Sequence, residues 1–322
     1  MKSILLISLT SISLVGYGQF GFDPIVTNQF REVSFTPTGH IFEDHFFLDE
    51  SEEFTNQISP SNIWFSGFDP DNGYIHSGET FYSFNPNFNN EFISGPILND
   101  TGLALKDASN YFERVWIISA EDFNAFKENI ENGISSLQEI PKDILEWPAR
   151  NNPHFSIGVE NGNILNQELA PFFDNNGDGN YNVLDGDLPL FKADLSFNSF
   201  NEVYSPEVFA FSVYNDTRFE SSDDFKMEIR QSVYMFSCAE QKDLNNTVFT
   251  NFSIQYKGDK TIDDFKLAFW EDSDVGCNSH SMGFNKALNS NYSYLENYKL
   301  STCNNFSSDD LDINYGVTKN TI

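Results

Sequence analysis

Alternation of apolar and polar residues is the clearest pattern in the second half of the chain. From 248 to 256 every second residue is apolar or β-branched, and the positions between them include Asn251, Ser253 and Gln255. This two-residue period is typical of a strand with one buried face. Similar runs at 225–236 and 265–270 predict three successive antiparallel strands. The predicted fold class is therefore mostly β, as an antiparallel β-sandwich-like arrangement with one or two short helices and a calcium-type loop.

One helix is predicted over residues 120–132. Ser119 and Asp122 have the spacing of a capping box, with Asp in place of the usual Glu. Apolar residues then recur at helical spacing as far as Ile130, and Gly133 stands where a helix C-cap is expected. The pattern therefore supplies a start, an apolar face and an end for this helix.

The chain is predicted to divide near residue 150. A second, shorter helix is expected over 141–147, and the composition turns to Pro, Asn and Gly over 148–165. We expect a β-rich N-terminal region at 19–150, which contains the helix near 120–132. A β-sandwich-like region at 151–322 is expected to follow it.

Residues 1–18 have the three parts of a secretory signal peptide. Lys2 gives a positive start, residues 4–15 are apolar apart from Ser and Thr, and Gly16 and Gly18 precede a cleavage site before Gln19. The apolar run is shorter than the ~20 residues that span a membrane. We therefore expect a secreted protein or one on the outer cell surface, with no transmembrane segment. The alternative is an N-terminal strand or helix buried in the fold.

The charge balance excludes several classes of protein. The chain has 18 basic and 48 acidic residues and a net charge of −30, so it is not expected to bind nucleic acid or an anionic membrane. Aromatic residues make up 16% of the chain, which is more than disordered proteins contain. An acidic globular protein remains.

Residues 174–185 match the spacing of a calcium-binding loop. Carboxylate and amide side chains stand at alternate positions, and Gly179 falls at position six, where the turn needs a residue without Cβ. The spacing wraps oxygen atoms around one hard cation, and the predicted cofactor is Ca²⁺. The alternative is an Asn/Asp/Gly turn without metal. Asn180, at position seven, is expected to bind through its backbone carbonyl, and Asn182, at position nine, through a water molecule. The predicted ligands are Asp174, Asn176, Asp178, Asn180, Asn182 and Asp185.

The surroundings of this loop limit the kind of calcium protein it can belong to. Position twelve is Asp, as in dockerin loops, but no second copy follows, so cohesin docking is not expected. Pro171 and Pro189 oppose long flanking helices. A second acidic run at 271–276 could hold another ion or be a strand-end turn, and 69–73 is expected to be a plain β-turn.

No catalytic set is recognisable in the sequence. The five histidines are scattered, and neither a nucleophile elbow nor a phosphate-binding glycine loop is present. Cys277 and Cys303 could form a disulfide, or all three cysteines could be thiols. The four tryptophans could stack on sugars or belong to the core: exposed, coplanar rings would favour sugar binding, and buried rings a scaffold.

Several segments in order resemble large secreted Bacteroidetes-type surface proteins. They are 63–69 (Ile-Trp-Phe-Ser-Gly-Phe-Asp), 92–97, 115–120, 140–148, the loop region 169–189 and 269–276 (Phe-Trp-Glu-Asp-Ser-Asp-Val-Gly). The resemblance implies export by the type IX secretion route, with a C-terminal sorting domain, and it implies calcium. This chain ends at Ile322 without such a domain, so either it is a fragment or its export differs. The resemblance carries no reaction.

These observations favour a secreted, calcium-stabilised, non-catalytic cell-surface or adhesion module. Its expected partners are surface glycans or other extracellular proteins. One alternative is a secreted carbohydrate-binding or carbohydrate-degrading protein with exposed Trp and paired acids. The other is the N-terminal fragment of a larger exported protein.

Overall fold

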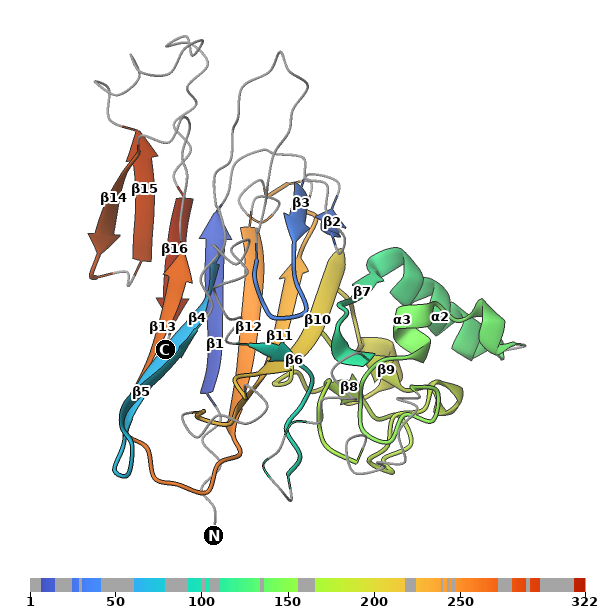
Figure 1. The fold of residues 1–322 in the computed structure, drawn as a ribbon. Coiled ribbons are helices and arrows are strands. Elements are labelled where there is room, and N and C mark those ends of the chain that lie inside the picture. Colours follow the sequence, from blue (N-terminus) through green and yellow to red (C-terminus); the bar gives the residue numbers. More distant parts are fainter. Residues whose placement is uncertain are drawn as a thin grey trace, which may run out of the picture.

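The computed structural model of the chain is mostly β, with antiparallel sheets and two helices among the residues it describes (Figure 1). This confirms the predicted mostly-β fold class with antiparallel sheets and short helices, while the calcium-type loop stays a prediction. The described residues are 7–14, 25–28, 31–41, 61–78, 92–99, 102, 104, 111–133, 136–155, 166–217, 224–238, 240–241, 244, 247–271, 280–287, 290–295 and 316–321. No helix among them is both long and apolar enough to cross a membrane.

The larger sheet has nine strands, in the order β14-β15-β16-β1-β12-β11-β10-β6, with β7 also paired to β10. Every pairing in it is antiparallel. Its strands are β1 (Ile7–Leu14), β6 (Ile93–Ser94), β7 (Trp116–Ser119), β10 (Val208–Asn215), β11 (Met227–Met235), β12 (Thr247–Tyr256), β14 (His280–Asn285), β15 (Ser290–Leu295) and β16 (Gly316–Thr321).

A three-stranded sheet, β13-β4-β5, packs against the larger one. It consists of β4 (Ser61–Asp69), β5 (Gly73–Gly78) and β13 (Asp263–Glu271). Ile63, Phe65 and Ile75 of the small sheet share one hydrophobic cluster with Phe252 and Ile254 of β12. Two sheets with a common apolar interior form the predicted sandwich.

The predicted run of three neighbouring strands is correct for only two of them. β11 and β12 pair as expected, but β13 leaves the larger sheet and pairs with β4. Phe265, Leu267 and Phe269 of β13 pack on the cluster between the sheets. Their alternation predicts a buried face equally well in either sheet, so the sequence pattern could not distinguish the two positions.

Helix α2 (Ala120–Asn132) and the one-turn α3 (Lys142–Leu145) lie beside β7. Ser119 caps α2 by accepting a hydrogen bond from Asp122 N, and Gly133 ends it with a φ of 83°, as predicted. The remaining elements are β2 (Ile25–Asn28), β3 (Arg31–Ser34), β8 (Phe172–Phe173), β9 (Leu188–Pro189) and short 3-10 turns at Leu137–Glu139, Val183–Asp185 and Phe200–Glu202.

The largest hydrophobic cluster draws its residues from both sides of residue 150. Trp116, Phe123 and Trp147 come from one side, and Tyr181 and Phe209 from the other. All five side chains are fully buried. The two predicted regions therefore contribute to a common core.

Part of the predicted signal peptide has a place in the larger sheet. The backbone of Ile7–Leu14 forms β1, which pairs with β12 on one side and with β16 on the other. This is the arrangement that the sequence left open as its alternative, an N-terminal strand within the fold. Removal of residues 1–18 stays a prediction, and it would remove β1 from between β12 and β16.

Candidate functional site

The predicted calcium loop is an excursion from the core between two short paired strands. β8 and β9 close its base, with Phe172 opposite Pro189 and Phe173 opposite Leu188. Within the loop, Tyr181 and Val183 are fully buried in the large cluster. The Tyr181 hydroxyl donates to Ile144 O at 2.7 Å. The loop is thus attached to the molecule by its apolar residues, while its polar positions face outward.

Asp174, at position one, organises the first turn of the loop. Its Oδ1 accepts a hydrogen bond from Gly177 N and its Oδ2 accepts one from Gly179 N, both at 2.7 Å. Gly177 and Gly179 have φ values of 76° and 78°. The sequence predicted the need for glycine at 179, and a left-handed backbone is the physical reason for it.

The following polar residues each accept a hydrogen bond from a backbone amide two residues further on. Asn176 Oδ1 accepts from Asp178 N at 3.0 Å, Asp178 Oδ1 from Asn180 N at 2.7 Å, and Asn182 Oδ1 from Leu184 N at 3.1 Å. Such bonds are typical of Asn- and Asp-rich turns. The bond from Asn180 N lowers the pKa of Asp178, so this exposed carboxylate is ionised at neutral pH.

The last two predicted ligands are joined to each other. Asn182 Nδ2 donates to Asp185 Oδ2 at 2.8 Å. Asn180, whose backbone carbonyl was expected to bind the ion, accepts a side-chain hydrogen bond from Asn151 Nδ2 at 2.6 Å. Hydrogen bonds therefore join Asn176, Asp178 and Asn180 in one group and Asn182 and Asp185 in another.

Asp187 is the residue of this loop that the sequence analysis missed. It is fully buried, and its two oxygens accept hydrogen bonds from Asn175 N and Asn182 N, both at 2.8 Å. Burial raises its pKa to about 6, and the nearby charges of Asp174 and Asp185 add to the rise. Asp187 thus ties the two halves of the loop together. Its position outside the calcium spacing gave no indication of this role.

The donor set suits a hard cation. Carboxylate and amide oxygens are the ligands that Ca²⁺ prefers. Each carboxylate oxygen of Asp174 accepts one hydrogen bond from a backbone amide, so each keeps a further lone pair that can bind a cation. Among the described residues, however, no three His, Cys, Asp or Glu side chains converge closely enough to hold a metal ion. Calcium binding by the loop therefore stays a prediction. Asp272 and Asp274 of the second acidic run lie outside the described residues. The predicted disulfide partners Cys277 and Cys303 lie outside them as well.

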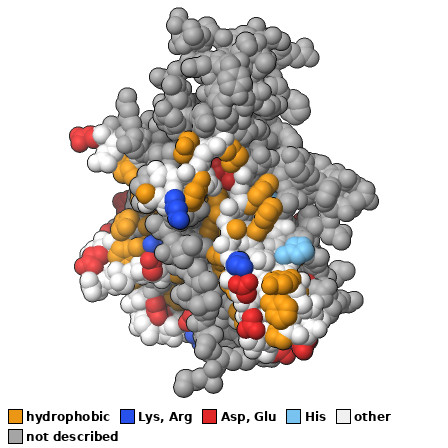
Figure 2. All heavy atoms as spheres, turned by 90° about the vertical axis from the view of Figure 1, so that its left-hand side faces the viewer, with side chains coloured by type: hydrophobic (Ala, Val, Ile, Leu, Met, Phe, Trp, Pro, Cys, Tyr) orange, Lys and Arg blue, Asp and Glu red, His pale blue; other side chains and the backbone are white. Residues whose placement is uncertain are grey.

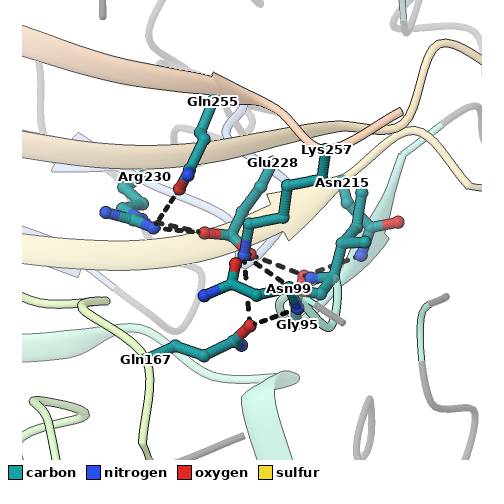
Figure 3. Close-up of polar contacts among 9 residues, drawn as sticks. Gly95, Asn99, Gln167, Asn215, Glu228, Arg230, Gln255 and Lys257 are labelled. Carbon is teal, nitrogen blue, oxygen red and sulfur yellow. Dashed lines mark hydrogen bonds and ion pairs between the residues drawn. The ribbon is translucent and has the colours of Figure 1, made fainter. Parts of the chain in front are cut away.

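A second concentration of charge lies inside the molecule, where β11, the end of β12 and the segment after β6 meet (Figure 3). Glu228 is fully buried and accepts hydrogen bonds from Arg230 Nε at 2.9 Å, from Lys257 Nζ and from Ile97 N at 2.9 Å. Burial opposes ionisation of Glu228, but the charges of Arg230 and Lys257 outweigh it and lower its pKa. Glu228 is therefore a buried carboxylate with two cationic partners.

The same cluster ties irregular segments to the sheet. Lys257 Nζ also donates to Ile97 O at 2.6 Å, and Gln167 Oε1 accepts from Asn99 N at 2.7 Å. The side chains of Glu228 and Lys257 are 0% and 3% exposed, so a dissolved substrate cannot reach them. The arrangement supports a structural role, in which Lys257 and Glu228 hold the segment after β6 in place.

The four tryptophans divide into two pairs. Trp116 and Trp147 are fully buried. The ring N–H of Trp116 donates to Glu146 O at 2.8 Å, and that of Trp147 donates to Pro171 O at 3.0 Å. Trp64 is 37% exposed and stacks on the half-buried Trp270, with ring centroids 5.6 Å apart and planes 10° apart. One pair therefore belongs to the core, and the other lies at the surface of the small sheet.

No protein-family model, curated protein or solved structure matches this chain. The resemblance to secreted surface proteins stays a prediction from the sequence motifs.

Proposed function

We propose that this chain is a secreted, non-catalytic surface or adhesion module whose fold is stabilised by calcium. The observation that carries this proposal is the loop at 174–187. Its oxygen-bearing side chains have calcium spacing, its two halves are tied together by buried Asp187, and its apolar residues insert into the large core.

A cation in this loop would act on the stability of the whole domain. Asp174, Asp178 and Asp185 repel one another at neutral pH unless a cation offsets their charge. An ion that binds only the folded loop stabilises the fold by mass action. Because Tyr181 and Val183 of the loop are part of the large core, an ion that holds the loop in its folded conformation also stabilises the packing of that core.

The surface location is supported by the predicted signal peptide, by the net charge of −30 and by the resemblance to type IX-exported proteins. The Glu228 cluster is consistent with a non-catalytic module, since Glu228 and Lys257 are buried and paired with each other. These features describe a stable display module that meets its partners through its surface.

The test is thermal unfolding with calcium and with chelator. Loops of this kind bind at about 10⁻⁴–10⁻³ M, so ~10 mM calcium gives up to about a hundredfold excess. We expect a gain of up to about 2.7 kcal/mol and a rise in melting temperature of up to about 4 °C. Asp178→Ala should lose most of that rise, because this carboxylate lies in the middle of the predicted ligand set.

The matched control is Asp71→Ala, in the β4–β5 turn. Asp71 is also an exposed aspartate in a turn rich in Asp and Asn, but that turn lacks the calcium spacing. The control should keep the full calcium effect. Equal melting temperatures of the unaltered protein in calcium and in chelator would show that 174–185 is a turn without metal, and would overturn the calcium part of the proposal.

A further inference from the structure

The outer face of the small sheet carries a regular arrangement of aromatic and polar side chains. On β4 the outward residues are Trp64, Ser66 and Phe68, because the residues between them face the core. Antiparallel register sets the neighbours of each on both sides. Gly78 and Ala268 flank Trp64, His76 and Lys266 flank Ser66, and Tyr74 lies opposite Phe68.

The small neighbours of Trp64 determine how its ring lies. A Cβ added to Gly78 would be 2.1 Å from Trp64 Cδ1, so the indole rests against the glycine backbone. On the other side, Trp270 stacks almost parallel to Trp64. Glycine at 78 is therefore required for this indole pair, in which Trp64 remains 37% exposed.

A polar row separates the indoles from a second aromatic pair. Phe68 and Tyr74 meet edge to face with centroids 5.2 Å apart, and Tyr74 is 77% exposed. Phe68 follows Trp64 by four positions, which is ~14 Å along a strand. Between them lie Ser66, His76 and Lys266, whose side chains offer hydrogen-bond donors and acceptors.

Figure 2 views the molecule from the side on which β4, β5 and β13 lie. Hydrophobic side chains reach the surface there, next to a histidine and to basic and acidic side chains. Lys266 pairs with Asp264 at 2.8 Å on this face. The surface is thus mixed, with apolar rings and hydrogen-bonding groups side by side.

We propose that this face, defined by Trp64, Trp270, Phe68, Tyr74 and the polar row between them, binds a neutral oligosaccharide. A pyranose ring has an apolar C–H face and a rim of hydroxyl groups. The negative face of an aromatic ring attracts C–H groups, and the polar row can bond the hydroxyls. The ~14 Å span requires an oligosaccharide and not a single sugar.

The charge of the protein selects among glycans and against other occupants. Asp264 borders the face and the net charge is −30, so an anionic polysaccharide is repelled. A second copy of the chain carries the same charge and is repelled likewise. A polar row in the centre of the face is also unlike the apolar centre of a stable protein interface. This inference goes beyond the proposed function and does not depend on calcium.

The experiment is calorimetric titration of the full chain, in calcium, with hexasaccharides of cellulose, xylan, mannan and amylose, and with a heparin hexasaccharide. We expect binding to at least one neutral probe and weaker or no binding to heparin. Trp64→Ala and Trp270→Ala should each reduce the affinity about tenfold or more. Gly78→Val should also reduce it, because the new side chain displaces the Trp64 ring while both indoles remain.

Phe284→Ala is the matched control, because Phe284 is 58% exposed but belongs to β14 of the other sheet. It should leave the affinity unchanged, and the melting temperature of each variant shows whether it is folded.

Absence of binding to all neutral probes by the folded protein overturns the proposal, and so does binding that survives the three substitutions. Self-association in sedimentation that Trp64→Ala abolishes would assign the face to a second copy instead. A calcium effect on melting is read separately, so the two proposals can fail independently.

Discussion

Two fully buried carboxylates in this protein differ in ionisation because their partners differ. Asp187 accepts hydrogen bonds from two neutral backbone amides and lies near other carboxylates, and its pKa rises to about 6. Glu228 has a guanidinium and an ammonium as partners, and its pKa falls despite complete burial. Burial alone therefore does not decide the charge of a buried acid: neighbouring charges do.

We expect Lys257→Met to destabilise the fold by about 3–5 kcal/mol. The substitution leaves Glu228 buried with only Arg230 as a cationic partner. Removal of one partner from a buried ion pair lowers the free energy of unfolding by about this amount. Chemical denaturation measures the change. The control is Lys142→Met, whose side chain is 74% exposed and 3.9 Å from Glu146, and which should change stability by less than about 1 kcal/mol. A loss as small as the control's would show that Lys257 is dispensable to the cluster.

Sequence could predict the loop residues but not the buried charges. Calcium spacing is local, so Asp174 to Asp185 could be named from position alone, and the glycine at 179 from its backbone requirement. Glu228, Lys257 and Gln167 meet only because distant segments fold together. Asp187 stands beside the loop in sequence, but its burial depends on packing against the core. Neither the Glu228 cluster nor the burial of Asp187 leaves a pattern in the sequence.

At the scale of elements, the prediction was most accurate where local chemistry decides. Helix α2 begins and ends at the predicted residues because Ser119 and Gly133 cap it. The strands at 225–236 and 248–256 pair as expected. The partner of β13 could not be predicted, because alternation shows that a face is buried and not which sheet covers it.

The hairpin of β10 and β11 depends on Asp216, and we predict that it gives stability a pH dependence. Asp216 is buried and accepts hydrogen bonds from Phe225 N and Met227 N at 2.7 Å. Burial raises its pKa to about 7. Between pH ~4 and ~7 Asp216 is therefore more protonated in the folded state than in the unfolded state. The contribution of Asp216 to the free energy of unfolding falls as the pH rises through this range.

The measurement is the free energy of unfolding of the unaltered protein and of Asp216→Asn between pH 4 and 7. The advantage of the unaltered protein over the variant should shrink by an amount on the order of 4 kcal/mol as the pH rises. Asparagine does not titrate, so other groups cancel in the comparison. Parallel curves for the two proteins would show that Asp216 has an ordinary pKa.

At the scale of the whole molecule, the sandwich follows from the alternating strands, but its shared core does not. Residues from both sides of 150 pack in one cluster around Trp147 and Phe209. A change of composition along the chain, such as that at 148–165, shows where irregular segments lie. It cannot show whether the flanking regions pack together.

Export is predicted to remove residues 1–18. The n-region, apolar stretch and small residues before Gln19 are those of a cleaved leader. N-terminal sequencing or intact mass of protein recovered outside the cytoplasm should give a chain that starts at Gln19. Recovery of the exported protein with Met1 intact would instead identify the segment as a permanent part of the sheet.

The position of β1 has a practical consequence for anyone who prepares this protein. All eight residues of β1 pair with β12, so a chain that begins at Gln19 exposes one long side of β12, with its amides and carbonyls unmatched. Such an edge accepts a strand from any chain that offers one. Samples made from Met1 and from Gln19 should therefore differ in solubility and self-association.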